Sequence, residues 1–521
     1  MDDKIVRYLG SFQLDDDTIP GEIIHNKETG TIRLRLTKVY ESNKDLIMAS
    51  NPVPTDKITT TKDAVAWMKS TPEDLIIWRE EHAKKVRLYN CVGFITGILN
   101  DNTPVTLFNC RRVNEKSSFN TLSRKLTFSA EYIIWDDPNC VALDDVGKRV
   151  DRKYDKLVCV VENALGWIGA SRIQTESNGQ LEIKSTVRGK HRFSWNDAQI
   201  RFSTHIDSNI WGGNSNGKYT LTENLLFEIS TKSSPLPAHE FLKIRSNIIS
   251  MLSFALKGNI NIVSQYLCCN DDVFVYMENG TPIEGLSPEQ NKYYITSNEP
   301  KRRIWSTSPE DYNFNLSAFK GKEMSKILTD LEPVFTLYTS LFKYSDMPLE
   351  MVYLNMIQAV EKFHSVYHSY GGKRSKYVAQ IQERFGKHPN FSDLLKPLFL
   401  SPGQMGDHTD YVVLLSSIAD LLVDKGNEDD LFYAFYGIDR NFPYKLTATR
   451  HYYTHYSKEK KALIFKNHEL YDAIKIMKLL LEYRVSQYLG VDLSEKIKEQ
   501  IEDFLIIREH NKYLLPTTEE L

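Results

Sequence analysis

An arginine and a histidine stand five positions apart, as Arg450 and His455, in the segment RHYYTH at residues 450–455. A histidine with its ordinary pKa of about 6.5 can take a proton from a ribose 2'-OH or give one to the departing 5'-oxygen. An arginine supplies a permanent charge and paired donors for the phosphorane-like transition state. These two residue types can cleave an RNA phosphodiester without a metal, leaving a 2',3'-cyclic phosphate and a 5'-OH.

The residues around this segment suit a polyanion. Residues 444–467 contain six basic residues and one acidic residue, Glu459, in a chain whose net charge is -3. Such a local contrast is the electrostatic footprint of phosphate contacts, and tyrosines nearby could stack on unpaired bases. The predicted RNA-binding residues are Lys445, Tyr452, Tyr453, Lys458, Lys460 and Lys461. The ordinary alternative is a solvated basic helix face with tyrosines in the core.

Pro443, Thr447 and Thr449 precede the segment, which predicts a helix that begins near it with a threonine as N-cap. The N-terminus of such a helix would attract phosphate. Residues five apart lie ~140° apart around a helix, so Arg450 and His455 do not share a face of a straight helix. His451 and His455, four positions apart, do share one.

A zinc site is the competing interpretation of His451 and His455. The HExxH motif places its glutamate directly after the first histidine, and here that position is Tyr452. Because the base and a third ligand are both missing from the pattern, we predict no metal and no cofactor.

A second group of polar residues follows the expected helix LEMVYLNMIQAVEKFHSVYHSY, where Glu361, His364 and His368 line one face at spacings of three and four. Glu361 could orient a catalytic histidine or arginine from the other helix, and we include it among the catalytic candidates. The alternative is a helix-surface glutamate beside two ordinary histidines.

The elements that must position these residues change character along the chain. Up to about residue 230 the apolar period is two, as in Ile32, Leu34 and Leu36, and a turn is expected at 100–104 between two strands. A helix is expected over about 236–258, covering the sheet. Beyond about residue 315 the period is helical, with helices expected at 321–343, 348–369, 407–424 and 468–489.

These patterns predict an α+β multidomain fold. A β-rich N-terminal domain, with sandwich-like sheets and a covering helix, is expected over residues 1–305, and an all-α helical bundle over residues 306–521. Residues 208–220 are expected to form a long turn that exposes Trp211, which is a weak candidate for a ligand loop.

The composition indicates a soluble globular protein. Hydrophobic residues make up 41% of the 521 residues and charged residues 26%, and no apolar run approaches the roughly 18 residues that span a bilayer. The N-terminus lacks the features of a secretory signal, and six sparse cysteines without a CxxC pair suit reduced thiols. We therefore expect a cytoplasmic protein with no membrane partner.

The C-terminal part resembles the HEPN ribonucleases, whose signature is an arginine, four to six residues, and then a histidine. Arg450, His451 and His455 carry that resemblance, and the segment PLPAHEFLKIRSNIISMLSFALKG extends it to the ApeA-like branch of bacterial anti-phage defence proteins. The resemblance implies a HEPN homodimer in which two Arg/His sets face each other, and an abortive-infection outcome. Many relatives carry Asn after the arginine where this chain has His451, which leaves open which histidine acts as base or acid.

The leading hypothesis is a metal-independent endoribonuclease that cuts RNA, with tRNA as a candidate, under control of the β-domain and an unknown phage-derived trigger. One alternative is a non-catalytic HEPN module that binds RNA or a nucleotide while the β-domain recruits a partner. A third is a β-sandwich ligand-binding protein with a helical dimerisation tail.

Overall fold

The computed structural model describes most of the N-terminal half of the chain and the central helices of the C-terminal half. The described residues are 4–14, 17–40, 91–118, 120–143, 149–162, 164–169, 173–175, 181–183, 191–195, 197–211, 218–270, 273–274, 277–278, 281–282, 289–297, 312–319, 324–343, 347–367, 442–456, 461, 464–466, 468–493, 496–497, 499–500 and 503.

Among the described residues, thirteen strands form one sheet, and the remaining short strands pair in twos. The strands of the large sheet are β1 (Ile5–Leu14), β2 (Asp17–Asn26), β3 (Ile32–Val39), β4 (Cys91–Leu99), β5 (Pro104–Ser118), β6 (Ser123–Ala130), β7 (Tyr132–Trp135), β11 (Lys156–Val161), β14 (His191–Trp195), β15 (Ala198–Trp211), β16 (Lys218–Thr231), β18 (Ile262–Cys268) and β23 (Tyr293–Ser297). The short strands are β8 (Val141–Leu143), β9 (Arg149–Asp151), β10 (Lys153–Tyr154), β12 (Ile173–Thr175), β13 (Leu181–Ile183), β17 (Leu236–Pro237), β19 (Val273–Phe274), β20 (Met277–Glu278), β21 (Thr281–Pro282) and β22 (Glu289–Gln290).

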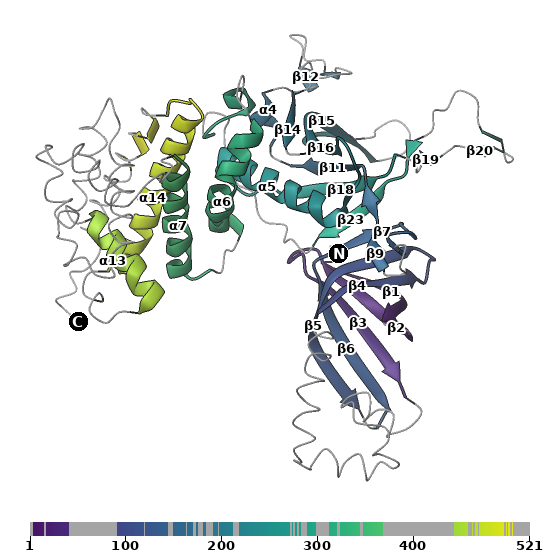
Figure 1. Cartoon of the computed structure of the whole chain (residues 1–521). Helices are drawn as coiled ribbons and strands as arrows, with labels where there is room; N and C mark the ends of the chain where they lie inside the picture. Colours follow the sequence, from purple (N-terminus) through teal and green to yellow (C-terminus); the bar gives the residue numbers. More distant parts are fainter. Residues whose placement is uncertain are drawn as a thin grey trace, which may run out of the picture.

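The described helices are α4 (Leu165–Ile168), α5 (Ala238–Leu256), the 3₁₀ helix η3 (Leu316–Phe319), α6 (Met324–Lys343), α7 (Leu349–Tyr367), α13 (Phe442–His455) and α14 (His468–Tyr488). Figure 1 shows the strands on one side of the molecule and α7, α13 and α14 on the other, with α5 and α6 between them. The α+β fold class predicted from the sequence is confirmed.

The first six strands close into a ring. The sheet order is β14-β15-β16-β11-β18-β23-β7-β5-β4-β1-β2-β3-β6, and β6 pairs in addition with β5, so β1 to β6 have no open edge along this pairing. Alternate residues face inward, and Ile32, Leu34 and Leu36 are 0%, 0% and 1% exposed. The period of two in this segment therefore fills the interior of the ring with side chains.

The other strands build a second core beneath α5. Apolar residues at helical spacing on α5, including Phe241, Ile248 and Leu252, are fully buried together with Phe202 and Phe227 of the sheet. The helix expected over about 236–258 is confirmed as α5, and it covers this part of the sheet as predicted.

Turn predictions had mixed outcomes. The hairpin at 100–104 is present, with Asn102 in the left-handed region at φ 68° and Asp101 accepting a hydrogen bond from the Thr103 N–H. The long turn expected at 208–220 was wrong at both ends. Strand β15 continues to Trp211 and β16 begins at Lys218, and these two residues pair. Cross-strand pairing extends the hairpin beyond the point at which glycines and asparagines suggested a loop.

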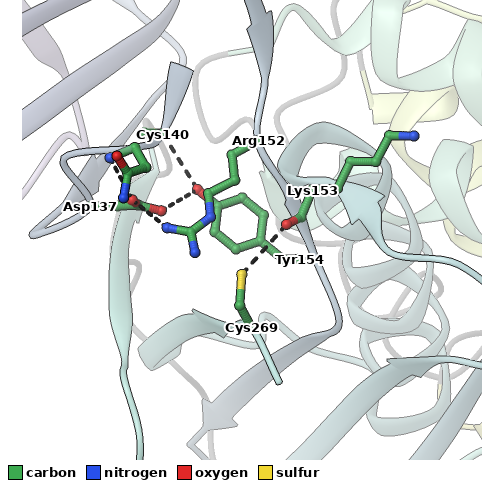
Figure 2. A network of polar contacts seen from close by, with 7 residues as sticks. Asp137, Cys140, Arg152, Lys153, Tyr154 and Cys269 are labelled. Carbon is green, nitrogen blue, oxygen red and sulfur yellow. Dashed lines mark hydrogen bonds and ion pairs between the residues drawn. The ribbon is translucent and has the colours of Figure 1, made fainter. Parts of the chain in front are cut away.

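A polar network holds the segment after β7 against this second core (Figure 2). The fully buried carboxylate of Asp137 accepts hydrogen bonds from Arg152 Nη1 at 2.7 Å and from the Tyr154 hydroxyl at 2.9 Å. The Cys269 thiol contacts the Lys153 carbonyl at 3.5 Å. Burial raises the pKa of Tyr154, so its hydroxyl remains a donor to Asp137. Burying the Asp137 carboxylate without partners would cost free energy, and these two hydrogen bonds offset that cost.

The helices expected at 321–343, 348–369 and 468–489 are confirmed as α6, α7 and α14, while 407–424 lies outside the described residues. On α14 the apolar residues at helical spacing are buried, and other faces of this helix are buried as well; those at helical spacing are Leu470, Ile474, Met477, Leu481 and Val485. Residues on both sides of position 305 share one continuous core. The division into domains 1–305 and 306–521 stays a prediction. Within the described helices, none is long and apolar enough to cross a membrane.

A buried carboxylate joins the β-rich part to the helices. Glu482 on α14 is 1% exposed and pairs with Lys257 at the end of α5 at 2.8 Å and with Lys478 at 3.7 Å. Tyr338 of α6 donates its hydroxyl to the same carboxylate. Burial opposes ionisation of Glu482, but the two ammonium groups and the hydroxyl outweigh it, so its pKa is held below the usual range.

We expect Glu482→Gln to lower the free energy of unfolding by about 3 kcal/mol at neutral pH, because it removes the carboxylate charge from between two ammonium groups. A lowered pKa means that this contribution is fully present above the ordinary carboxyl pKa of about 4.3 and is lost as the pH falls through the lower folded value. Urea unfolding of both proteins between about pH 7 and pH 3 measures this difference.

The matched control is Glu28→Gln, which removes an exposed ion pair with Lys4 and should change the stability by less than about 1 kcal/mol. A difference between wild type and Glu482→Gln that stays constant as the pH falls would contradict the assignment.

Candidate functional site

Helix α13 carries the segment 450–455 at its C-terminal end. It runs from Phe442 to His455, and Tyr456 then adopts a left-handed φ of 51°. The predicted helix start near the segment was therefore wrong, and so was the expectation of a helix N-terminus for phosphate. The C-terminal end of a helix carries the negative pole of its dipole, so phosphate recognition here depends on side chains.

The two threonines that suggested an N-cap are buried inside α13. Thr447 and Thr449 are 1% and 0% exposed, and the Thr449 hydroxyl accepts a hydrogen bond from the Phe465 N–H at 2.9 Å. Thr449 thus fixes the segment that follows α13 instead of beginning the helix. A tertiary hydrogen bond has overridden the local capping preference.

Tyr353 of α7 seats α13 on the bundle. This tyrosine is fully buried and donates its hydroxyl to the carbonyl of Leu446, while its ring lies edge-on to Tyr453 at 6.4 Å between centroids. Burial raises the pKa of Tyr353 well above its usual value, and the nearby charge of Arg450 partly opposes that shift. The sequence analysis missed Tyr353, although it lies two helical turns before Glu361 on the same helix.

Arg450 and Glu361 meet between α13 and α7. Arg450 Nε lies 3.3 Å from Glu361 Oε1, and the two side chains are 27% and 28% exposed. The contact uses Nε, and the two Nη atoms carry four further N–H donors. Glu361 is thus brought to the arginine that the sequence singled out, while His364 of the same group is buried and His368 lies outside the described residues.

His451 and His455 lie side by side at the end of α13. Their ring centroids are 4.9 Å apart with the planes tilted by 53°, and His455 is exposed. Arg450 and His455 lie on the same helix, and positions five apart are ~140° apart around its axis, so the two side chains leave α13 in different directions. One chain therefore presents the arginine and the two imidazoles on different sides of the helix.

Tyrosines near the two histidines divide between surface and core. Tyr452 is half-buried, and its ring lies 5.4 Å from Tyr453 and 6.0 Å from Tyr456. Tyr456 is 72% exposed, whereas Tyr453 packs against Tyr353 and its pKa is raised by burial. Tyr452 and Tyr456 offer faces for base stacking, and Tyr453 mainly supports the helix.

The predicted lysines differ in their surroundings. Lys445 lies 3.6 Å from Glu469 and 5.8 Å from the centre of the Phe465 ring, while Lys461 is exposed. Lys458 and Lys460 lie outside the described residues. Glu469 comes just after the counted basic stretch, so the local positive charge is smaller than the sequence count indicated. In the part of the chain that the structure describes, no group of three or more His, Cys, Asp or Glu side chains could hold a metal ion.

Together these elements define a two-part α+β protein, with a large antiparallel sheet followed by a helical domain that bears an Arg-x₄-His helix. The family model described as ApeA N-terminal domain 1 matches residues 7–329, and the model described as Apea-like HEPN matches residues 354–495. Since the first match covers more than half of the chain, the protein belongs to the family of ApeA-like HEPN defence proteins, whose helical domain is of the nuclease type. No curated protein and no solved structure matches the chain.

Two contacts between α7 and α13 should differ in their effect on stability. We expect Tyr353→Phe to lower the free energy of unfolding by about 1.5 kcal/mol, because it removes a buried hydroxyl donor from the Leu446 carbonyl. Glu361→Gln should cost less than about 1 kcal/mol, because its ion pair with Arg450 is partly exposed to solvent. Urea denaturation of the two variants compares them, and the opposite ranking would contradict this account of how α13 is held.

Proposed function

We propose that this protein is a metal-independent endoribonuclease of anti-phage defence that acts by abortive infection, with tRNA as a candidate substrate. The observation that supports it best is the arrangement around α13. Glu361 of α7 forms an ion pair with Arg450, and two adjacent imidazoles lie at the exposed end of α13. Membership of the ApeA-like HEPN family agrees with a nuclease of this kind.

Each side chain has a defined task in this proposal. One of His455 and His451 removes the proton from the ribose 2'-OH, and an imidazolium protonates the departing 5'-oxygen. Arg450 places its Nη donors on the phosphoryl oxygens as negative charge develops. Glu361 acts as a positioning residue that orients the guanidinium through Nε. The products are a 2',3'-cyclic phosphate and a 5'-OH, and the reaction requires RNA.

Binding of the strand would fall to the surface around the site. Tyr452 and the exposed Tyr456 offer stacking faces, and Lys461 offers an exposed charge for the backbone. Lys445 serves this purpose less well, because Glu469 lies within ion-pair distance of it. Lys458 and Lys460 are kept in the proposed RNA-binding set on the strength of their sequence positions.

The complete site is proposed to form between two copies of the HEPN domain. In one chain Arg450 pairs with Glu361 of α7 while His455 ends α13, and on this basis we expect that a single copy does not bring the two onto one phosphate. A two-fold interface presents the same patch twice, which lets Arg450 of one subunit face His455 of the other. The β-rich domain, residues 1–305, is proposed to sense a phage-derived trigger and to restrain the dimer of residues 306–521.

Cleavage of total RNA in the presence of EDTA tests the catalytic assignment. We expect Arg450→Ala and His455→Ala each to lower the cleavage rate by about 10²-fold or more, because each removes a group that acts in the transition state. His468→Ala is the matched control, since His468 is an exposed histidine at the start of the neighbouring helix α14.

Cleavage by His455→Ala at the wild-type rate would overturn the proposal. RNA binding by all of the proteins without cleavage by any of them would favour the alternative, a non-catalytic RNA-binding module.

Mixing two inactive variants tests whether the site is shared between subunits. A heterodimer of Arg450→Ala and His455→Ala contains one site with both residues intact, so an equal mixture that exchanges subunits should regain about a quarter of the wild-type activity. Each variant alone should stay inactive. No recovery after subunit exchange, verified by tagged copies, would place the arginine and the histidine of each site in the same chain.

A further inference from the structure

A groove of about 260 Å³ lies where the closed ring of strands meets the sheet beneath α5. His25 and Lys27, at the end of β2 and in the turn after it, form one wall. Residues on or next to β18 and β23, including Asn261, Gln265 and Ser297, form the other. The groove is far along the chain from α13, and the proposed RNA site does not use it.

A buried positive charge lies behind the groove. Arg245 of α5 is 4% exposed, and its Nη1 donates to Gln265 Oε1 at 2.8 Å and to Ser297 Oγ at 3.3 Å. Gln265 is itself only 3% exposed. Gln265 and Ser297, which accept from Arg245, are neutral side chains that line the groove, so the guanidinium lies one residue behind its surface.

The hydrogen bonds around Ser297 fix the direction of its own hydroxyl hydrogen. Ser297 Oγ accepts from Arg245 Nη1 and also from Gln265 Nε2 at 3.1 Å. A serine oxygen has two lone pairs and one hydrogen, so these two bonds occupy its acceptor positions. Its O–H must then donate to an acceptor other than Arg245 and Gln265. Since Ser297 lines the groove, an acceptor bound in the groove can receive this hydrogen bond.

The rim of the groove adds cationic and donor groups. Lys27 is exposed, and His25 is half-buried beside it. The acidic neighbour of Lys27, Glu28, pairs with Lys4 at 3.3 Å, and Glu162 accepts a hydrogen bond from Asn261 at 2.7 Å. Among the described residues that line the groove, none is acidic.

We propose that this groove is a binding site for the phosphate group of a small ligand. The Ser297 hydroxyl would donate to a phosphate oxygen, Lys27 would supply the opposite charge at the rim, and Arg245 would add a positive field from behind. The phosphate could belong to inorganic phosphate or to a nucleotide, which share this chemistry. The site stands apart from the proposed nuclease activity, and its occupancy is measured without RNA.

A purely structural role is the competing explanation. The trio of Arg245, Gln265 and Ser297 ties α5 to β18 and β23, and that alone would stabilise the fold. In that case Ser297→Ala would lower the stability, but the groove would bind no phosphate. Lys27 takes no part in the trio and lies on the surface, so Lys27→Ala separates the two explanations.

Isothermal titration of the full-length protein in a phosphate-free buffer tests the proposal. The probes are inorganic phosphate and adenosine monophosphate, with adenosine as the uncharged control. We expect binding of at least one phosphate-bearing probe at millimolar concentration or below. Both Lys27→Ala and Ser297→Ala should weaken it about tenfold or more, because hydrogen bonds and charges directed at an anion contribute at least that much. Lys116→Ala, which removes an exposed lysine of β5 outside the groove, should change it less than about twofold.

Binding of adenosine monophosphate but not of inorganic phosphate would identify a nucleotide site, and the converse would identify a site for the free anion. The proposal is overturned if neither probe binds, or if Lys27→Ala binds as well as the wild type. It is also overturned if Lys116→Ala weakens binding as much as Lys27→Ala does.

Discussion

The arrangement of the two parts of this protein depends on one buried carboxylate. Glu482 accepts from Tyr338 and lies between two ammonium groups, which come from α5 and from α14 itself. Removing these charges from water is costly, and only the complete set of partners offsets that cost. The end of α5, the second half of α6 and the last turns of α14 must therefore meet at one point. Lys257 does so from a left-handed backbone with φ 55°, a conformation that glycine adopts more easily.

Helix α5 belongs to both parts of the molecule as a result. Its first turns bury Phe241 against the sheet, and its last turns place Phe254 against Tyr338 of α6 at 4.5 Å between ring centroids. Arg245 and Lys257 lie on this one helix, about 18 Å apart along its axis. A rigid helix thus connects the groove between the strands with the buried charge cluster of the helical domain, and any movement of α5 relative to the sheet must also disturb Glu482. Under the proposed regulation, α5 would be the physical route from the β-rich part to the domain that carries α13.

The sequence predicted the elements whose apolar residues repeat locally. Strand β3 and helices α5, α6, α7 and α14 follow from periods of two and 3.6, because burial of one face is recorded in consecutive residues. Closure of the ring could not be predicted, since Ile32 pairs with Ala130 and no local pattern encodes a partner so distant. The start of α13 was wrong for a related reason: Thr449 is satisfied by Phe465 and not by its own helix. The sequence also did not show that Glu469 of α14 lies beside Lys445, and this ion pair makes Lys445 less available for RNA.

RHYYTH lies at the C-terminal end of α13, and this position is electrostatically unfavourable for binding a phosphate. The carbonyl end of a helix repels phosphate, and Glu361 adds a negative charge beside Arg450. The electrostatic field of one chain therefore stabilises its own cationic side chains more than it attracts the RNA backbone. In the proposed two-fold dimer, a second copy brings another arginine and two more imidazoles to the same place, together with a second Glu361 and a second helix end. Dimerisation would therefore complete the proposed catalytic geometry by placing Arg450 of one subunit opposite His455 of the other. On this proposal an isolated subunit would be a poor nuclease, because positions 450 and 455 of one chain lie on different sides of α13.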